Sequence, residues 1–266
     1  MIDTLQVIIL ALVQGLTEFL PVSSSAHLIL VPTLLGWPDQ GIVFDVAVHL
    51  GTLIAVVGYF RKDITEMMPD FFGSLTGKGM TDKAKLAWGV GIGTIPAGLC
   101  GLLAKDFIEA NLRSPLVIAT TTIVFGLLLL FADRTAKLVR NIDQMGWGHY
   151  IAIGCAQALA LIPGTSRSGI TMTFALMMGY TRDAAARFSF LLSIPIIALS
   201  SLLVLKDLSE HTGPVDWQAL LLGVVLSAAA AFTCIMLFMK WIQRTDMSVF
   251  VIYRLLLGAF LFYVFW

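Results

Sequence analysis

Charged residues are scarce in this sequence. Of its 266 residues only 13% are charged, whereas 58% are hydrophobic and the mean hydropathy is +0.89. Soluble globular domains usually carry about 25% charged residues, so these proportions exclude a water-soluble enzyme. Seventeen Lys and Arg balance seventeen Asp and Glu, and the formal net charge of zero leaves no basic excess to hold a nucleic acid.

The sequence also has few cysteines and no basic N-terminal region. Cys100, Cys155 and Cys234 lie far apart in apolar stretches, which favours buried small hydrophobic residues over a disulfide framework or a metal cluster. No Lys or Arg precedes Arg61, so the basic region that begins a cleavable secretion signal is missing. We therefore expect the first apolar segment to remain in the mature protein.

The hydrophobic residues gather into ten apolar segments, at about 5–20, 24–35, 42–60, 86–104, 115–132, 147–162, 168–180, 188–205, 217–239 and 247–266. Six of them, the third, fourth, fifth, eighth, ninth and tenth, approach the roughly 20 residues that a helix needs to cross a bilayer. The pattern predicts an all-α integral membrane protein with six full transmembrane helices.

The other four apolar segments form two adjacent pairs, each interrupted by a polar stretch that contains proline. We term these stretches the first tip, Pro-Val-Ser-Ser-Ser-Ala-His at 21–27, and the second tip, Pro-Gly-Thr-Ser-Arg-Ser-Gly at 163–169. Non-helical backbone at membrane depth is tolerated only where protein or a wet cavity surrounds it. Both pairs are therefore predicted to be re-entrant helix pairs, or broken helices, whose tips point at a site.

A weak internal repeat relates the two pairs. A shift of 142 residues places Leu-Pro-Val-Ser-Ser at 20–24 over Ile-Pro-Gly-Thr-Ser at 162–166, and a shift of 144 places 44–51 over 188–195. The single membrane domain, 1–266, then divides into halves of about 1–133 and 134–266, each with one re-entrant pair and three crossings. Because three is odd, the second half is expected to be inverted relative to the first, as in transporter-like folds with a site near the midplane.

Basic residues are distributed unevenly among the loops. Twelve Lys and Arg residues fall in four loops that this topology places on one side, at 61–85, 133–146, 181–187 and 240–246. The opposite side holds only Lys105, Arg113 and Lys206. Loops rich in Lys and Arg remain in the cytoplasm, so both termini and the mouth of the first pair are expected outside, and the second pair is expected to enter from the cytoplasm.

One of the basic loops has a further feature. The segment from Ser74 to Lys85 contains two glycines and three lysines. We expect it to be the most flexible loop of the chain.

Several ionisable residues fall inside the apolar segments, namely Glu18, His27, Asp45, His49, Arg167 and Arg254. Each costs at least about 2.5–3.5 kcal/mol to insert into a membrane, so such residues are functional candidates by default. For Asp45, His49 and Arg254 the sequence leaves a second interpretation equally open, a buried polar network that only holds helices together.

The first tip and the residues before it have the parts of an anion and cation site. Gln14 and Glu18 are four residues apart and share one face of a helix, where they could hold a ligand or a cation. Pro21 ends that helix, and His27 lies near the first turn of the next one. Helix N-termini with free N–H groups and hydroxyls bind phosphate. The alternative is that His27 is a satisfied polar residue and that three serines are only helix caps: Ser23, Ser24 and Ser25.

The second tip has the parts of an oxyanion clamp. Gly164 and Gly169 would let the backbone approach a ligand closely, and Arg167 offers a bidentate fork to phosphate oxygens. Further donors come from the hydroxyls of Ser166, Ser168 and Thr171. The alternative is that Arg167 forms only a buried salt bridge with Glu18.

At these two tips the chain resembles the undecaprenyl-pyrophosphate phosphatases of the bacitracin-resistance (BacA/UppP) type. Gln-Gly-Leu-Thr-Glu at 14–18 is similar to the family's E/Q-x-x-x-E motif, and 21–27 is similar to its serine-histidine stretch. Residues 163–171 fit its P-G-x-S-R-S-x-x-T motif at every fixed position. Gln14 stands at a position that is Glu or Gln in the family, which leaves Glu18 as the only acidic residue of the motif.

The resemblance implies a multi-pass enzyme of the bacterial inner membrane. Such an enzyme hydrolyses the C55 isoprenyl pyrophosphate to the monophosphate carrier used in peptidoglycan synthesis, with a divalent cation such as Mg²⁺ or Ca²⁺. It is expected to act on this membrane lipid and on no nucleic acid, and both a monomer and a homo-oligomer remain open.

The residues suggest a role for each group in such a reaction, because phosphoryl transfer depends mostly on positioning and charge stabilisation. We expect Arg167 and the N–H groups of the tips to bind the pyrophosphate, Glu18 and Gln14 to hold the cation, and His27 to transfer a proton. Ser24 is the expected nucleophile, and attack by a water molecule is the alternative. The remaining pyrophosphate ligands are expected to be Ser23, Ser25, Gly164, Ser166, Ser168, Gly169 and Thr171.

Two other functions fit parts of the pattern. A polyprenyl-phosphate flippase or transporter would also have broken helices and tips rich in hydroxyl and basic groups. A lipid phosphatase of the PAP2 type is discounted, although Ser-Ser-Ala-His at 24–27 faintly resembles its P-S-G-H motif, because the next histidine after Arg167 is His211 in an outer loop.

Overall fold

The structure, a computed structural model, describes residues 3–209 and 216–266, without the side chains of 105, 106, 109 and 203–209. The charges of Lys105 and Lys206 and the position of His211, on which parts of the sequence interpretation depend, therefore lie outside the described residues. The described chain is helical, with eleven α-helices and two short 3-10 helices and with no β-strand in these two ranges.

Six helices are long and apolar enough to cross a membrane. They are α3 (Ile42–Tyr59), α5 (Asp82–Asn111), α6 (Pro115–Thr135), α9 (Arg182–Ser209), α10 (Trp217–Trp241) and α11 (Ser248–Phe265). These are the six segments that the sequence predicts as spans, so that prediction is confirmed. The chain is a multi-pass, all-α membrane protein.

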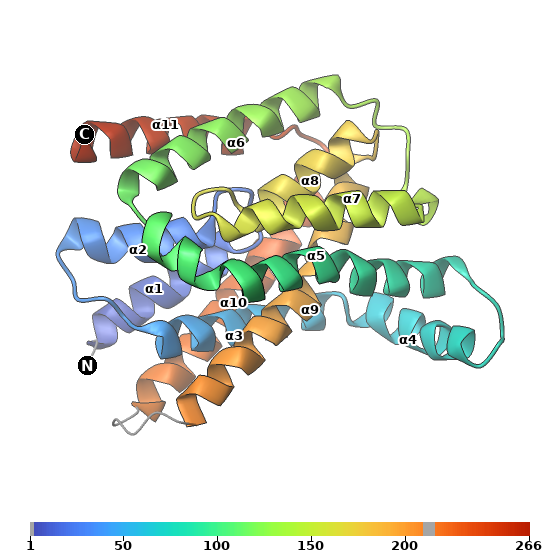
Figure 1. Cartoon of the computed structure of the whole chain (residues 1–266), viewed down its shortest axis with the longest axis horizontal. Helices are drawn as coiled ribbons and strands as arrows, with labels where there is room; N and C mark the ends of the chain where they lie inside the picture. The colour runs from blue at the N-terminus through green and yellow to red at the C-terminus, as the bar shows by residue number, and fades with distance from the viewer. Residues whose placement is uncertain (1–2, 210–215) are drawn as a thin grey trace.

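Four further helices form the two predicted pairs and are too short to cross. They are α1 (Thr4–Thr17), α2 (Ser24–Leu35), α7 (Trp147–Ala158), which the 3-10 helix η2 (Leu159–Leu161) extends, and α8 (Arg167–Met177). At about 1.5 Å per residue each is shorter than the roughly 30 Å hydrocarbon core. Helix α1 packs on α2 and α7 packs on α8. The turns of the two pairs lie close together near the middle of the molecule (Figure 1).

Local sequence explains where the helices start. Asp3 and Gln6 form a capping box at α1, and the Thr81 hydroxyl accepts from the Ala84 amide at α5. Ser114 caps α6, whose first residue is Pro115, the position at which proline costs no hydrogen bond. Because these signals are local, the sequence locates most of the helix starts correctly.

The helix α4 (Arg61–Leu75) and the turn after it correct the sequence interpretation, which treats 61–85 as a loop. α4 is amphipathic and is not an apolar run, and for that reason it escapes a search for membrane segments. It packs on α5, with the Phe71 and Trp88 rings 5.0 Å apart. Helix α5 already begins at Asp82, so only 76–81 connects the two helices, and the expected loop over 74–85 is wrong at both of its ends.

The cysteines are a second correction. Cys234 is buried, as expected, but Cys100 and Cys155 are exposed on the outer surfaces of α5 and α7. All three are free thiols. A surface that faces lipid accepts small apolar residues as readily as a protein core does, so an apolar sequence context does not separate the two environments.

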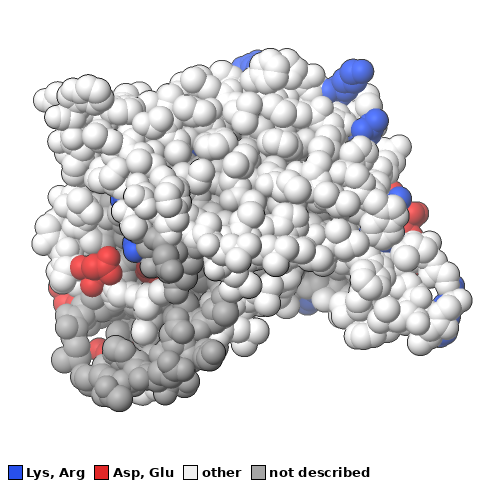
Figure 2. Space-filling view, in the orientation of Figure 1, with Lys and Arg blue, Asp and Glu red and all other residues white. Residues whose placement is uncertain are grey.

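Positive charge is concentrated at one end of the molecule. Both chain ends lie at the left of Figure 1, whereas most of the Lys and Arg side chains visible in Figure 2 gather along the right and upper right edges. The loop between α6 and α7, one of the basic loops, contains the 3-10 helix η1 (Ile142–Gln144). The long helices run between these two ends.

The largest hydrophobic cluster anchors the first tip. Phe19 is fully buried between α1 and the tip, and its ring meets that of Phe190 of α9 edge-on at 5.2 Å. Phe190 in turn contacts Phe60 and Phe238. Burying such rings contributes about 1.5–3 kcal/mol each. The backbone that carries Glu18 is therefore attached to three spanning helices.

Candidate active site

Both tips place a serine in a strained conformation directly before a helix. Ser23 has φ 73° and Ser166 has φ 72°, values that residues with a side chain seldom adopt. The Ser166 hydroxyl caps α8 by accepting from the Gly169 amide at 3.2 Å. The Ser23 side chain makes no capping hydrogen bond, so the expectation that this serine caps α2 is wrong. Strain of this kind is concentrated at functional sites.

Glu18 is the centre of the site. Its Oε1 accepts from Arg167 Nη2 at 2.7 Å, which joins the two tips across 149 residues of sequence. Its Oε2 accepts from Gln14 Nε2 at 2.9 Å and from the Ser24 hydroxyl, and it lies 3.7 Å from His49 Nε2. A buried carboxylate needs such partners, since an unpaired one would be very costly in this environment. The structure therefore brings together four residues that the sequence proposes for the site.

A cavity of about 220 Å³ opens beside this cluster. Its polar lining comes from residues of both tips, from Glu18 just before the first tip, and from α3 and α9: Glu18, Ser23, Ser24, Ser25, His49, Ser166, Arg167 and Ser200. The rest of its lining is aliphatic: Ala160, Leu161, Ile196 and Ile197. The cavity thus combines charged and hydroxyl groups with aliphatic side chains, a lining that suits a ligand with both a polar and an apolar part.

His27 does not reach Glu18 or Ser24 through any hydrogen bond in the structure. Its Nδ1 lies 2.7 Å from the carbonyl oxygen of Ser23, and its Nε2 lies 2.5 Å from the hydroxyl of Tyr253 on α11. Since a carbonyl oxygen only accepts, Nδ1 carries the hydrogen. The imidazole therefore donates to the backbone of strained Ser23. The Ser24 hydroxyl donates to Glu18.

The glycines and two hydroxyls of the second tip are committed to packing. A Cβ on Gly164 would lie 2.1 Å from Thr121 Oγ1 of α6, and one on Gly169 would lie 3.0 Å from Arg254 Nη1. Ser168 donates to the carbonyl of Leu20 at 2.8 Å, and the Thr171 hydroxyl lies 2.7 Å from that of Ser189. None of these four residues lines the cavity, whereas Ser23, Ser25 and Ser166 do.

Arg254 holds the backbone of both tips. Its side chain is fully buried and donates to the carbonyls of Pro21, Thr122, Gly164 and Thr165 at 2.9–3.2 Å. It makes no hydrogen bond to Asp45 or His49 among the described residues, so the single network of these three residues is not present. Asp45 instead accepts from Gln40 at 2.7 Å.

Replacing Arg254 with methionine is expected to destabilise the protein by about 3–5 kcal/mol. Several buried carbonyls would lose their donor, and each unsatisfied group costs about 1–3 kcal/mol. The measurement is thermal unfolding in detergent. Arg134→Met is the matched control, because Arg134 is exposed and pairs with Asp246 only at 3.4 Å. Equal melting temperatures for the two variants would contradict this role of Arg254.

Sequence comparison now assigns the chain to a family. The family model described as "Bacitracin resistance protein BacA" matches residues 7–260. The chain belongs to the BacA family. It is 59% identical to "Undecaprenyl-diphosphatase 2" of Stutzerimonas stutzeri (strain A1501) over 99% of this chain and 98% of the relative. It is 56% identical to "Undecaprenyl-diphosphatase" of Thioalkalivibrio sulfidiphilus (strain HL-EbGR7) over 99% of this chain and the whole relative.

Among the described residues of this BacA protein, several buried polar atoms have no hydrogen-bond partner, and three of them belong to the second tip or to Gln14 beside Glu18: Arg167 Nη1, Gln14 Oε1 and Thr165 Oγ1. Arg167 Nη1 is a free donor on a positively charged guanidinium, and such a group suits an anionic ligand. Gln14 Oε1 is a free acceptor beside the Glu18 carboxylate, and an amide oxygen next to a carboxylate suits a hard divalent cation. No group of three His, Cys, Asp or Glu side chains with the arrangement of a metal site occurs in the described part of the chain.

The structure adds residues to the site that the sequence does not assign to it. His49 lies on the cavity, and the signal for it was its position inside an apolar segment. Tyr253 and Ser200 carry no such signal, because a tyrosine or serine in a spanning helix is ordinary. Only the packing of α11 and α9 against the tips reveals them.

Proposed function

We propose that this BacA protein is an undecaprenyl-diphosphatase of the bacterial inner membrane, which hydrolyses the C55 isoprenyl diphosphate to the monophosphate carrier and phosphate for peptidoglycan synthesis. The observation that carries the proposal is the cluster of Glu18, Ser24 and Arg167 on one cavity. The names of relatives that match nearly the whole chain support it. The aliphatic part of the cavity lining suits the isoprenyl chain.

The Arg167 fork is proposed to bind the diphosphate. Arg167 Nη2 donates to Glu18 and Nη1 has no partner among the described residues, so the guanidinium can donate to phosphate oxygens while it keeps its contact with Glu18. A guanidinium presents two parallel donors to phosphate and remains charged at all accessible pH values. Hydroxyls of Ser23, Ser25 and Ser166 line the same cavity and add donors. Gly164, Ser168, Gly169 and Thr171 would act by keeping the second tip in place.

Ser24 is proposed as the nucleophile. Its hydroxyl donates to Glu18 Oε2, so as Oγ bonds to the terminal phosphorus the proton passes to that carboxylate. The bond from phosphorus to the bridging oxygen breaks, and the isoprenyl monophosphate leaves. Water then attacks the phosphoserine, which releases phosphate and restores the serine. Direct attack by water activated by Glu18 or His27 would need the same groups.

A divalent cation, Mg²⁺ or Ca²⁺, is proposed to assist. Mg²⁺ is commonly held by one or two carboxylates together with substrate phosphates, and here Glu18 and the free Gln14 oxygen would supply the protein ligands. When bound, the cation neutralises charge on the diphosphate. Because only one carboxylate is present, the substrate would complete the site.

The direct test is phosphate release from long-chain prenyl diphosphate by the purified protein in detergent. We expect turnover with Mg²⁺ or Ca²⁺, its loss in EDTA and its recovery when the cation is restored. A flippase or transporter would bind the lipid but release no phosphate. Full activity in EDTA would leave the hydrolase assignment intact and reject the cation.

The inverted repeat and the re-entrant pairs are proposed on the pattern of helix packing. Helix α1 packs on α10 and α7 packs on α5, while α3 packs on α10 and α9 packs on α5. In the proposed halves, 1–133 and 134–266, helix α1 corresponds to α7, α3 to α9 and α5 to α10. Each contact from the first half to the second therefore has a counterpart from the second half to the first. The helices after the tips start 143 residues apart, at Ser24 and Arg167. Short pairs with central turns suit re-entrant elements.

Both termini are proposed to lie outside. The chain ends lie opposite the basic end of the molecule (Figures 1 and 2), and basic loops stay in the cytoplasm. A single cysteine placed after Trp266, in a chain whose three cysteines are replaced by alanine, should react with a membrane-impermeant maleimide in intact cells. A cysteine at Lys78, between α4 and α5, should not react. Labelling of the Lys78→Cys variant without labelling of the C-terminal cysteine would show the opposite orientation.

A further inference from the structure

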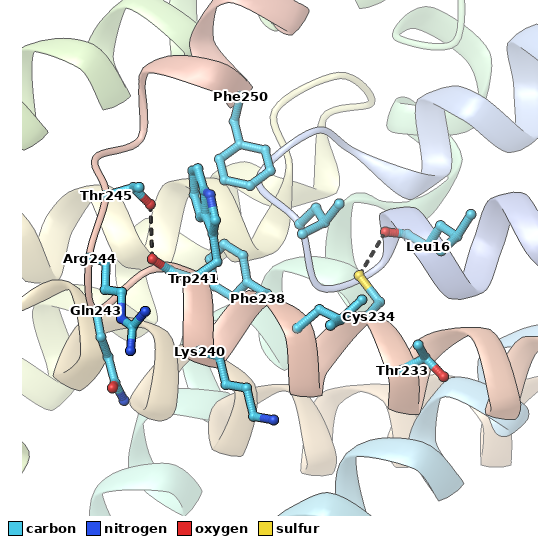
Figure 3. Close-up of a pocket in the computed structure, with 12 residues that line it drawn as sticks. Leu16, Thr233, Cys234, Phe238, Lys240, Trp241, Gln243, Arg244, Thr245 and Phe250 are labelled. Carbon is cyan, nitrogen blue, oxygen red and sulfur yellow. Dashed lines mark hydrogen bonds between the residues drawn. The ribbon is translucent and has the colours of Figure 1, made fainter.

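A second and larger cavity lies away from the candidate site. Its volume is about 860 Å³, which lies in the range of ligand-sized pockets. It is lined by the end of α10, the end of α1 and the start of α11, and most of its wall is apolar. Figure 3 shows Trp241 and Phe250 on one side of it, with Cys234 and Leu16 on the other.

Aromatic side chains form one wall of this cavity. The Trp241 and Phe250 rings meet edge-on at 5.3 Å, and the Phe238 and Phe250 rings are 5.6 Å apart. Leu237 is 57% exposed and also lines the cavity. This part of the cavity suits a hydrocarbon chain.

Two basic side chains stand at the end of α10 beside this apolar wall. Lys240 and Arg244 are exposed and line the cavity (Figure 3). Neither has a carboxylate within salt-bridge distance among the described residues. The nearby acids have other partners, since Asp183 accepts from Gln243 and Asp246 pairs with Arg134. Lys240 and Arg244 therefore have no ion-pair partner among the described residues.

We propose that this cavity binds an anionic phospholipid. Its phosphate would lie on Lys240 and Arg244, and one acyl chain would run along Leu237, Phe238 and Phe250 toward α1. Basic pockets between membrane helices at the cytoplasmic side recognise anionic head groups in this way. A zwitterionic lipid gains less, because its own ammonium group offsets the attraction.

The bound lipid would contact the back of the first tip. Leu16 and Leu20 line the cavity, the Leu16 carbonyl accepts from Cys234 Sγ at 3.2 Å, and the Leu20 carbonyl accepts from Ser168 at 2.8 Å. The chain would thus fill space behind the backbone that carries Glu18. The binding itself does not depend on the proposed diphosphatase activity.

The test is titration of the purified protein with dioleoyl phosphatidylglycerol or dioleoyl phosphatidylcholine, followed by native mass spectrometry. We expect tighter binding of phosphatidylglycerol. The double variant K240Q/R244Q should weaken it about 25-fold, since each basic residue near an anionic lipid contributes about fivefold, and should leave phosphatidylcholine binding unchanged. The control K62Q/K78Q removes the same charge from exposed positions away from the cavity and should have little effect.

A third variant tests the acyl-chain position. Leu237→Trp narrows the cavity from a half-exposed position and should weaken binding of both lipids while the protein still purifies. Equal affinity of the wild-type protein for the two lipids would overturn the proposal, as would an equal loss in K240Q/R244Q and K62Q/K78Q. Unchanged lipid binding by L237W would place the lipid elsewhere.

Discussion

Replacing Arg167 with alanine should lower the turnover of prenyl diphosphate by at least about 10²–10³-fold while the protein still inserts and purifies. The Arg167 guanidinium lines the cavity, donates to Glu18 and has one donor, Nη1, without a partner among the described residues. It is therefore placed to neutralise negative charge that develops on the phosphate. One donor of this kind typically accounts for about 10²–10³ in rate. The measurement is kcat and kcat/KM for phosphate release in detergent.

The conservative variant separates charge from geometry. Arg167→Lys keeps the positive charge but offers no planar fork, so it should also be poor. Arg134→Ala, which removes an exposed arginine far from the cavity, is the control and should retain normal kinetics. Activity near that of wild type in Arg167→Ala would remove the second tip from the catalytic site.

Replacing Ser24 with alanine should reduce kcat by about 10³-fold or more with little change in substrate affinity. Arg167 and the cation held by Glu18 would still bind the diphosphate, whereas the attacking oxygen would be missing. Rapid acid quench with labelled substrate should trap a phosphoserine at position 24 in the wild-type protein. Substantial turnover in Ser24→Ala, with no trapped intermediate, would favour direct attack by water at the same site.

Neighbouring residues provide the controls for Ser24. Ser25 is exposed, and its hydroxyl lies 3.4 Å from that of Ser23, so Ser25→Ala should be much milder. His27→Ala should lower activity severely. The variant would lose the hydrogen bond to the Ser23 carbonyl and any proton transfer by the imidazole. Tyr253→Phe removes only the partner of Nε2 and should be intermediate. Equal effects of His27→Ala and Ser25→Ala would exclude a role for the imidazole.

Much of the site could be predicted because its signals are local or chemically unusual. Glu18 and Arg167 are ionisable residues inside apolar segments, where a charge is too costly without a role. Prolines at 21 and 163 interrupt helices, and serines follow both. These features indicated two polar tips before any contact was known, and the Glu18–Arg167 pair that joins them was itself one of the alternatives considered.

The orientation of individual side chains could not be predicted. His27 is one turn from Ser24, yet its two nitrogens bind the Ser23 carbonyl and Tyr253, which lies 226 residues away. Gly164 and Gly169 match a phosphate-binding pattern, but their missing Cβ atoms admit Thr121 and Arg254 instead. In both cases the partner belongs to α6 or α11, and spacing along the tip carries no information about it.

The membrane class, the six spans, the two tips and the residue types of the candidate site can all be read from the order of amino acids, because hydrophobic length, proline and capping act over a few residues. The contact of Glu18 with Ser24, the hydrogen bonds of Arg254 to both tips and the position of His49 on the cavity come from the folded arrangement alone. Those outcomes depend on which distant helices pack together. Buried polar groups must then take whichever partners that packing brings within hydrogen-bond distance.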